Sequence, residues 1–185
     1  MPVLDINIEE AKRIFDTNFW GALNMIHAFA PLVIKAKGSI VNVTSIAGHV
    51  NVPYMGLYAA SKHSLEIISE TLRLEMQPFN VTVLSVVTGA VDTLGNSYFT
   101  DFKLPEGSIY APIESTIASR AQGHDGVKRA SRKEYAIKVV AEVARGVGGK
   151  MWCGSNAGGV KFGKTFVPQS ILVSATLSWW NACSR

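Results

Sequence analysis

Hydrophobic residues along the chain alternate between helical spacing and short uninterrupted runs. Asn7 and Glu10 have the spacing of a capping box, and apolar residues then recur every three or four positions, which predicts an amphipathic helix. Two later runs of β-branched residues are too short for helices and too apolar for loops, so they are predicted as buried strands. The predicted order is a helix over 8–30, a strand over 39–44, a helix over 59–76 and a strand over 81–87.

This order of helix, buried strand, helix and buried strand is typical of a parallel sheet covered by crossover helices. We therefore expect an α/β fold. Residues 94–132 lose the periodicity and collect glycine, proline, serine and charged residues, which predicts a loop region over a site. A further helix is expected over 134–145 and a last short strand over 150–153. Because there is no internal repeat and no long linker, residues 1–185 are interpreted as a single domain.

Composition excludes several classes of protein. Of the 185 residues, 48% are hydrophobic and 17% are charged, which is enough apolar sequence for a buried core and argues against disorder. The net charge of +4 is spread without a long basic run, so anionic ligands are tolerated and no nucleic-acid partner is expected. Cys153 and Cys183 lack the spacing of a zinc module, so we expect no bound metal and a reducing compartment.

Both ends of the chain bear on its location. The first residues have neither the basic start nor the apolar stretch of a signal peptide, which favours a cytoplasmic protein. Residues 165–184 carry no charge and include Trp179 and Trp180, a residue type enriched at membrane interfaces. Two interpretations of this segment stay open: peripheral contact with a membrane, or burial in the core or in a subunit contact.

Tyr58 and Lys62 are the first candidates for chemistry. Their spacing of four places both side chains on one face at the start of a helix, about one turn apart. A nearby ammonium stabilises a phenolate, which lets a tyrosine act as an acid or base near neutral pH. A surface tyrosine beside a solvated lysine gives the same pattern, so the pair alone does not decide.

Two polar residues earlier in the chain add to this pair. Ser45 ends the first predicted strand, and ligands of open α/β sheets bind beyond the carboxyl ends of strands. Asn18 lies inside the first predicted helix, where an amide has few structural reasons to be. Taken singly, the serine is explained as a turn cap and the asparagine as a solvent-facing amide.

In type, order and spacing, this set resembles the catalytic tetrad of the short-chain dehydrogenase/reductase family. The four residues are Asn18, Ser45, Tyr58 and Lys62. The resemblance implies a Rossmann-like fold and hydride transfer between a nicotinamide cofactor and a carbonyl or alcohol. It also implies roles: Tyr58 protonates the developing alkoxide, and Ser45 polarises the carbonyl. Lys62 would hold the nicotinamide ribose, and Asn18 would position a water that resupplies protons.

The sequence segments around the tetrad also resemble motifs of the family. The segments 42–48 (NVTSIAG) and 58–62 (YAASK) are close to its strand-end and active-site motifs. After the second strand, Gly89 and Thr93 match a family segment that borders the nicotinamide, with Thr88 in place of its proline. The resemblance therefore implies cofactor contacts from Tyr58, Lys62, Gly89, Val91 and Thr93.

More narrowly, the chain is similar to fungal NADPH-dependent 1-acyldihydroxyacetone-phosphate reductases. This likeness rests on segments 19–21 (FWG), 87–91 (VTGAV) and 152–157 (WCGSNA). It implies NADP as cofactor, with NAD as the alternative, and a homo-oligomer. An acyl-ketone phosphate and a fungal secondary-metabolite carbonyl both stay open as substrates. Association of the cytoplasmic protein with the endoplasmic reticulum or lipid droplets stays open as well.

The family's glycine-rich pyrophosphate turn has no counterpart in these residues. The sequence resembles a family member entered after its fourth strand, so we expect the C-terminal part of a doubly wound sheet without its first strands. Weak or no binding of NADPH by these residues follows from that expectation. The alternative hypothesis is a catalytically inactive fragment that acts only through association with a partner subunit.

Other residues that attract attention are interpreted structurally. The histidines show no metal spacing and are expected to serve packing in the core or at the surface; they are His27, His49, His63 and His124. The pairs Gly148–Gly149 and Gly158–Gly159 lack a surrounding strand, turn and helix, so they are interpreted as turns rather than phosphate loops.

Overall fold

The structure is a computed structural model that describes residues 1–174, apart from the side chains of residues 96 and 97. Short 3-10 turns separate its main elements. In chain order these are α1 (Ile8–Phe15), α2 (Gly21–Ala36), β1 (Ser39–Ser45), α3 (Gly56–Met76), β2 (Thr82–Thr88), α4 (Glu114–Ala121), α5 (Arg132–Ala144), β3 (Gly149–Cys153) and α6 (Ala157–Phe166).

A single helical run connects α1 to α2. The Asn7 side chain caps it, accepting hydrogen bonds from the amides of Glu9 and Glu10 at 2.9 and 3.2 Å. A π-helical turn over Asp16–Trp20 joins the two helices. The run ends at Ala36 rather than at residue 30, because α2 accommodates Pro31 and stops only where the backbone turns left-handed. By length and composition alone this run could cross a membrane, as core helices of soluble proteins also could.

The three strands form a parallel sheet in the order β1-β2-β3. Ser39 pairs with Thr82 and Ser45 with Thr88, so the first two strands end at the same level. The α/β prediction is confirmed, and so is the short strand expected near residue 150. Within the part of the chain that the structure describes, β1 is an edge strand.

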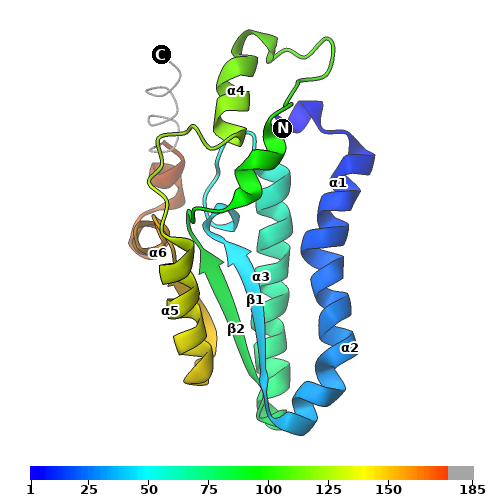
Figure 1. The fold of residues 1–185 in the computed structure, drawn as a ribbon, viewed down its shortest axis with the longest axis vertical. Coiled ribbons are helices and arrows are strands. Elements are labelled where there is room, and N and C mark those ends of the chain that lie inside the picture. The colour runs from blue at the N-terminus through cyan, green and yellow to red at the C-terminus, as the bar shows by residue number, and fades with distance from the viewer. Residues whose placement is uncertain (175–185) are drawn as a thin grey trace.

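Helices cover both faces of the sheet (Figure 1). On one face α2 and α3 enclose a core cluster, whose buried members are Ile26, Ile40, Val81 and Val83. On the other face α5 packs over a second cluster, whose buried members are Leu84, Val86 and Cys153. Burial on both sides explains why the strands read as continuous apolar runs rather than as alternating patterns.

The region between β2 and α5 lies beyond the carboxyl ends of the strands, as Figure 1 shows. It contains one helix, α4, that the prediction of an irregular loop missed. The Ser108 hydroxyl donates to the Asp5 carboxylate at 2.6 Å and ties this region to the N-terminal turn.

Gly158 and Gly159 lie inside α6, so the interpretation of this pair as a turn is wrong. Their helical conformation follows from context, because α6 packs on β3 and glycine is only weakly unfavourable in a helix. Trp179 and Trp180, on which the membrane prediction depends, lie outside the described residues.

Candidate active site

Ser45 lies at the carboxyl end of β1 and is almost fully buried. Its hydroxyl accepts a hydrogen bond from the amide of Ala47 at 3.1 Å, which caps the 3-10 turn over Ile46–Gly48. The serine is therefore a turn cap, as the plain interpretation held, and it also stands where ligands of such sheets bind.

Tyr58 and Lys62 lie in the first turns of α3. The Lys62 ammonium donates a hydrogen bond to the Val43 carbonyl at 3.2 Å. Burial lowers the pKa of Lys62 below its ordinary value. Among the described residues, none is hydrogen-bonded to the Tyr58 hydroxyl, so the lysine is bound to the sheet edge and the phenol is open to a ligand.

Asn18 lies in the π-helical turn between α1 and α2. Its amide donates to the Ser61 hydroxyl at 3.0 Å, and that hydroxyl donates to the backbone carbonyl of Tyr58 at 2.8 Å. Ser61 is completely buried. These two bonds connect two members of the set, since they tie Asn18 through Ser61 to the turn of α3 that carries Tyr58. π-Helical turns occur often at functional sites.

Gly89 follows β2 where another loop comes very close. Its amide donates to the Cys153 carbonyl at 2.8 Å, and a Cβ at this position would lie 2.0 Å from the carbonyl oxygen of Ser155. Gly154 faces it with a positive φ of 98°. The glycine is required by this close approach of two backbones.

Val91 and Thr93 continue the segment after β2. Val91 forms a parallel β-bridge with Ala130. In this bridge the Ala130 amide donates to the Ala90 carbonyl, and the Asp92 amide donates to the Ala130 carbonyl. Neither backbone group of Val91 takes part in these two bonds. Thr93 is exposed and accepts from the Gly95 amide at 3.4 Å, capping the 3-10 turn Leu94–Phe99.

Thr88 stands at the position where the family motif has proline. Its hydroxyl lies 2.7 Å from the phenol oxygen of Tyr135 and donates to the Val86 carbonyl at 3.2 Å. Burial raises the pKa of Tyr135, although the Thr88 contact opposes the shift. The threonine thus fixes the strand end by one side-chain contact to α5 and one to its own strand.

A cavity of about 410 Å³ lies between α2, the free edge of β1 and α3. Asn18 and Lys62 line it together with apolar residues such as Phe29 and Leu65. The volume is that of a small-ligand pocket, with a cation and an amide over mostly apolar walls. Ser45 and Tyr58 do not line this cavity, so it brings together only half of the tetrad.

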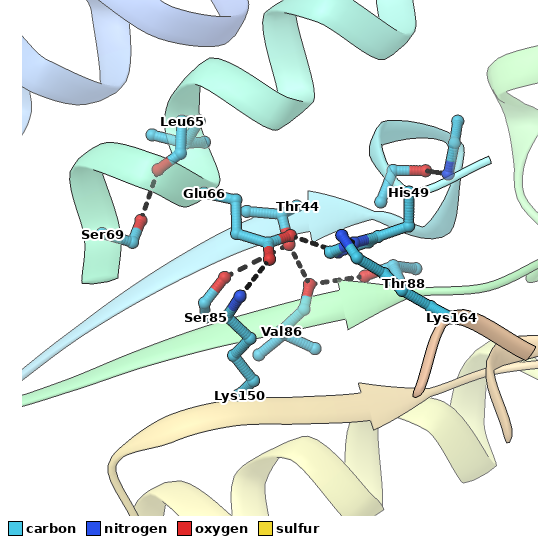
Figure 2. A network of polar contacts seen from close by, with 12 residues as sticks. Thr44, His49, Leu65, Glu66, Ser69, Ser85, Val86, Thr88, Lys150 and Lys164 are labelled. Carbon is cyan, nitrogen blue, oxygen red and sulfur yellow. Dashed lines mark hydrogen bonds and ion pairs between the residues drawn. The ribbon is translucent and has the colours of Figure 1, made fainter. Parts of the chain in front are cut away.

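A buried polar cluster next to the tetrad was missed by the sequence analysis (Figure 2). His49 Nε2 lies 2.6 Å from a Glu66 carboxylate oxygen, and Lys150 binds the other oxygen at 2.7 Å. Lys164 lies 2.6 Å from His49 Nδ1. His49 is a buried histidine, as expected, but its side chain has polar partners from two other elements, Glu66 on α3 and Lys164 on α6. The sequence feature that could have indicated this cluster is Glu66, a charged residue four positions after Lys62 on a helix that packs on the sheet.

The described residues contain no set of side chains that could bind a metal ion. No group of three histidine, cysteine, aspartate or glutamate side chains there is placed to hold an ion. Cys153 is a free, buried thiol.

Comparison with known proteins decides the family. A model of the short chain dehydrogenase family matches residues 1–103. The chain belongs to the short-chain dehydrogenase family. A short-chain dehydrogenase of Penicillium ochrochloron, ptmH, is 43% identical over 157 residues, which are 85% of this chain and 57% of that protein. The chain therefore spans little more than half the length of this relative.

Two further similarities bear on the cofactor and the substrate. An NADPH-dependent 1-acyldihydroxyacetone phosphate reductase of Schizosaccharomyces pombe is 41% identical over 120 residues, covering 63% of this chain and 40% of that protein. The crystal structure of a short chain dehydrogenase from Burkholderia cenocepacia in complex with NADP is 26% identical. It matches with a TM-score of 0.68 over 92% of this chain and 61% of that one.

Proposed function

We propose that the chain functions in an NADP-dependent oxidoreductase that reduces a ketone to an alcohol. One observation carries the proposal: the two hydrogen bonds from Asn18 through Ser61 to the Tyr58 carbonyl. They hold the candidate asparagine against the helix of the candidate tyrosine and lysine, at the end of the sheet where Ser45 lies. Such an arrangement suits catalysis, since it fixes the helix turn that carries Tyr58 while the Tyr58 hydroxyl itself has no hydrogen-bond partner among the described residues.

The proposed cofactor is NADPH, which supplies the hydride when it is bound. Support comes from the NADPH-dependent relative and the NADP-bound structure. Lys62 is proposed to hold the nicotinamide ribose, and the backbone of Val91 and the hydroxyl of Thr93 its carboxamide. Gly89 is proposed to contribute by letting the loops after β2 and β3 meet closely.

Three side chains are proposed to act on the carbonyl. The Ser45 hydroxyl donates a hydrogen bond to the carbonyl oxygen and orients it. The Tyr58 phenol gives its proton to that oxygen as negative charge develops there, leaving a phenolate and an alcohol. The Lys62 ammonium stabilises the phenolate, because opposite charges favour the ionised form. Asn18 is proposed to order a water through which the phenolate regains its proton.

Two substrate classes compete. An acyl-ketone phosphate follows from the reductase of Schizosaccharomyces pombe, and the net charge of +4 suits its phosphate. A fungal secondary-metabolite ketone follows from the similarity to ptmH. Both classes are small molecules, and the region between β2 and α5 is proposed to discriminate between them.

NADPH oxidation by the purified chain tests the proposal, with 1-acyldihydroxyacetone phosphate and a panel of aliphatic and aromatic ketones as substrates. We expect turnover that depends on both NADPH and ketone. Tyr58→Phe should lower kcat about a hundredfold or more while leaving the Kd for NADPH within about twofold. Ser64→Ala, which removes a hydroxyl that bonds only the Ala60 carbonyl of the same helix, is the control and should keep wild-type turnover. Full turnover by Tyr58→Phe would refute the assignment.

A second candidate function is association without catalysis. The observation that favours it is the exposed apolar surface of the helical run, formed by Trp20, Met25, Phe29 and Leu32. In this case the chain forms a stable oligomer with copies of itself and oxidises no NADPH. Sedimentation of the chain, measured beside the turnover assay, separates the two candidates.

A further inference from the structure

His49 and Glu66 join two elements of the candidate site. His49 ends the 3-10 turn that Ser45 begins, and its amide donates to the Ile46 carbonyl at 2.9 Å. Glu66 lies on α3, eight residues after Tyr58 and four after Lys62. The hydrogen bond between the two side chains is 2.6 Å long and crosses from the turn to the helix.

Backbone packing makes this crossing tight. A Cβ at Gly48 would lie 3.1 Å from the backbone nitrogen of His63, so the turn contacts α3 without room for a side chain. The imidazole of His49 also lies against the ring of Trp152, with ring centroids 4.7 Å apart. Among the hydrogen bonds of the described residues, the one between the His49 and Glu66 side chains is the bond that joins this turn to α3.

Neighbouring cations fix the protonation of the pair. An ammonium can only donate, so Lys164 requires His49 Nδ1 as an acceptor. Nε2 faces the Glu66 carboxylate (Figure 2), so the proton of the neutral ring is assigned to Nε2, from which it can be donated to that carboxylate. Lys150 binds the other carboxylate oxygen at 2.7 Å. Burial alone would raise the pKa of Glu66, but the bonds from His49 and Lys150 outweigh it and the pKa is lowered.

We propose that His49 and Glu66 are positioning residues, which hold the Ser45 turn against α3 and so set the placement of Ser45 relative to Tyr58. The proposal rests on the proposed reductase function. Both side chains are almost completely shielded from solvent, at 1% and 3% exposure, and neither touches the open ends of Ser45 and Tyr58. A buried hydrogen bond of this kind specifies one geometry, because its loss leaves a buried carboxylate only partly satisfied.

A second buried bond between strand and helix provides the matched control. The Asn42 amide donates to the Ser69 hydroxyl at 2.8 Å, and this bond joins β1 to α3 away from the turn. Ser69→Ala should therefore lower stability without loosening the Ser45 turn. His49→Leu removes the donor to Glu66, whereas His49→Gln keeps an N–H at a similar reach.

Amide hydrogen exchange of the full chain, measured by NMR, tests the proposal. The readout is the amide of Ala47, which donates to the Ser45 hydroxyl. We expect exchange about tenfold faster or more in His49→Leu than in Ser69→Ala, and near the wild-type rate in His49→Gln. Equal Ala47 exchange in His49→Leu and Ser69→Ala would overturn the proposal. Should His49→Leu not fold, His49→Asn takes its place, since its amide is too short to reach Glu66.

Turnover provides a second, separable readout. With NADPH and a ketone, His49→Leu should lower kcat about tenfold or more with little change in the KM for NADPH, and His49→Gln should recover most of it. Ser69→Ala should retain wild-type kcat. Unchanged kcat in His49→Leu would contradict the positioning role. Absence of turnover in the wild type would count against the proposed function, and the exchange of Ala47 would still decide whether the pair holds the turn.

Discussion

The ammonium of Lys62 donates a hydrogen bond to the carbonyl oxygen of Val43 over 3.2 Å. Val43 lies on the outer edge of β1, and 50% of its surface is exposed. The carbonyl that Lys62 binds thus belongs to a strand with no further strand beside it in the described part of the chain. Unpaired edge groups need partners, and a lysine is a common means of protecting an edge. The same cation is the one that the proposed reaction needs beside Tyr58.

Lys62→Met is expected to make the chain more stable and less active. Burial lowers the folded-state pKa of Lys62 below 10.5, so the unfolded chain binds this proton more tightly. The buried charge therefore costs stability at all pH values below the folded pKa, and the cost disappears as the pH rises from that pKa to 10.5. We expect Tm to rise at neutral pH.

Thermal unfolding over a pH series checks this prediction. The gain in Tm should shrink as the pH approaches 10.5. Lys161→Met, at an exposed lysine on α6, is the control and should leave Tm nearly unchanged. A lower Tm for Lys62→Met would show that the bond to Val43 outweighs the cost of burial. NADPH turnover should fall in the same variant, because the ammonium proposed to stabilise the Tyr58 phenolate is removed.

Ser61→Ala should uncouple Asn18 from α3. The substitution deletes both the acceptor of the Asn18 amide and the donor to the Tyr58 carbonyl. We expect a loss of about 1–3 kcal/mol of unfolding free energy, because Ser61 is completely buried. Ser64→Ala removes a similar hydroxyl that only bonds the Ala60 carbonyl of its own helix, and should cost less than about 0.5 kcal/mol. Urea unfolding measures both; equal losses would mean that the connection to Asn18 contributes nothing.

The fold could be predicted from the sequence because the strands are continuous apolar runs that are easily recognised. Runs such as Val83–Val87 are buried on both faces, and helices between them carry regular apolar spacing, so order and class followed directly. Boundaries were less certain where helical residues were polar. Helix α4 contains Glu114, Ser115 and Arg120 with one buried apolar residue, Ile117, and its pattern resembled a loop.

The candidate site could be predicted only in part, since the tetrad is a pattern in sequence and its support is a set of contacts in space. Asn18 and Ser61 are far apart in the chain, and no spacing rule links them. Lys150 and Lys164 reach the His49–Glu66 pair from β3 and α6. Their partnership depends on how the sheet and helices pack, which residue types alone do not specify.

Glu66→Gln should make stability less dependent on pH in acid. The folded-state pKa of Glu66 is lowered below 4.5, so its charge contributes stability that is fully present above 4.5 and is lost as the pH falls through the folded pKa. Breaking a buried ion pair costs about 3–5 kcal/mol at neutral pH. We therefore expect that the wild type is more stable than Glu66→Gln at neutral pH and that the difference closes in acid.

Urea unfolding between neutral and acid pH measures this difference. Glu75→Gln, at an exposed glutamate on the same helix, is the control and should follow the wild type at every pH. A difference between Glu66→Gln and the wild type that stays constant below pH 4.5 would mean that the charge of Glu66 does not contribute.

Gly89→Ala should destabilise the meeting of the loops after β2 and β3. The added Cβ would lie 2.0 Å from the Ser155 carbonyl oxygen, and this contact is with backbone, which cannot rotate away as a side chain does. We expect a loss of about 3 kcal/mol of unfolding free energy, at the upper end for overpacking. Gly159→Ala is the matched control, since a Cβ there meets nothing within 4 Å and alanine favours the helix by up to about 1 kcal/mol. Urea midpoints at unchanged m-value measure both variants. Wild-type stability in Gly89→Ala would mean that Ser155 moves freely, and the close approach of the two loops would then not be needed for the fold.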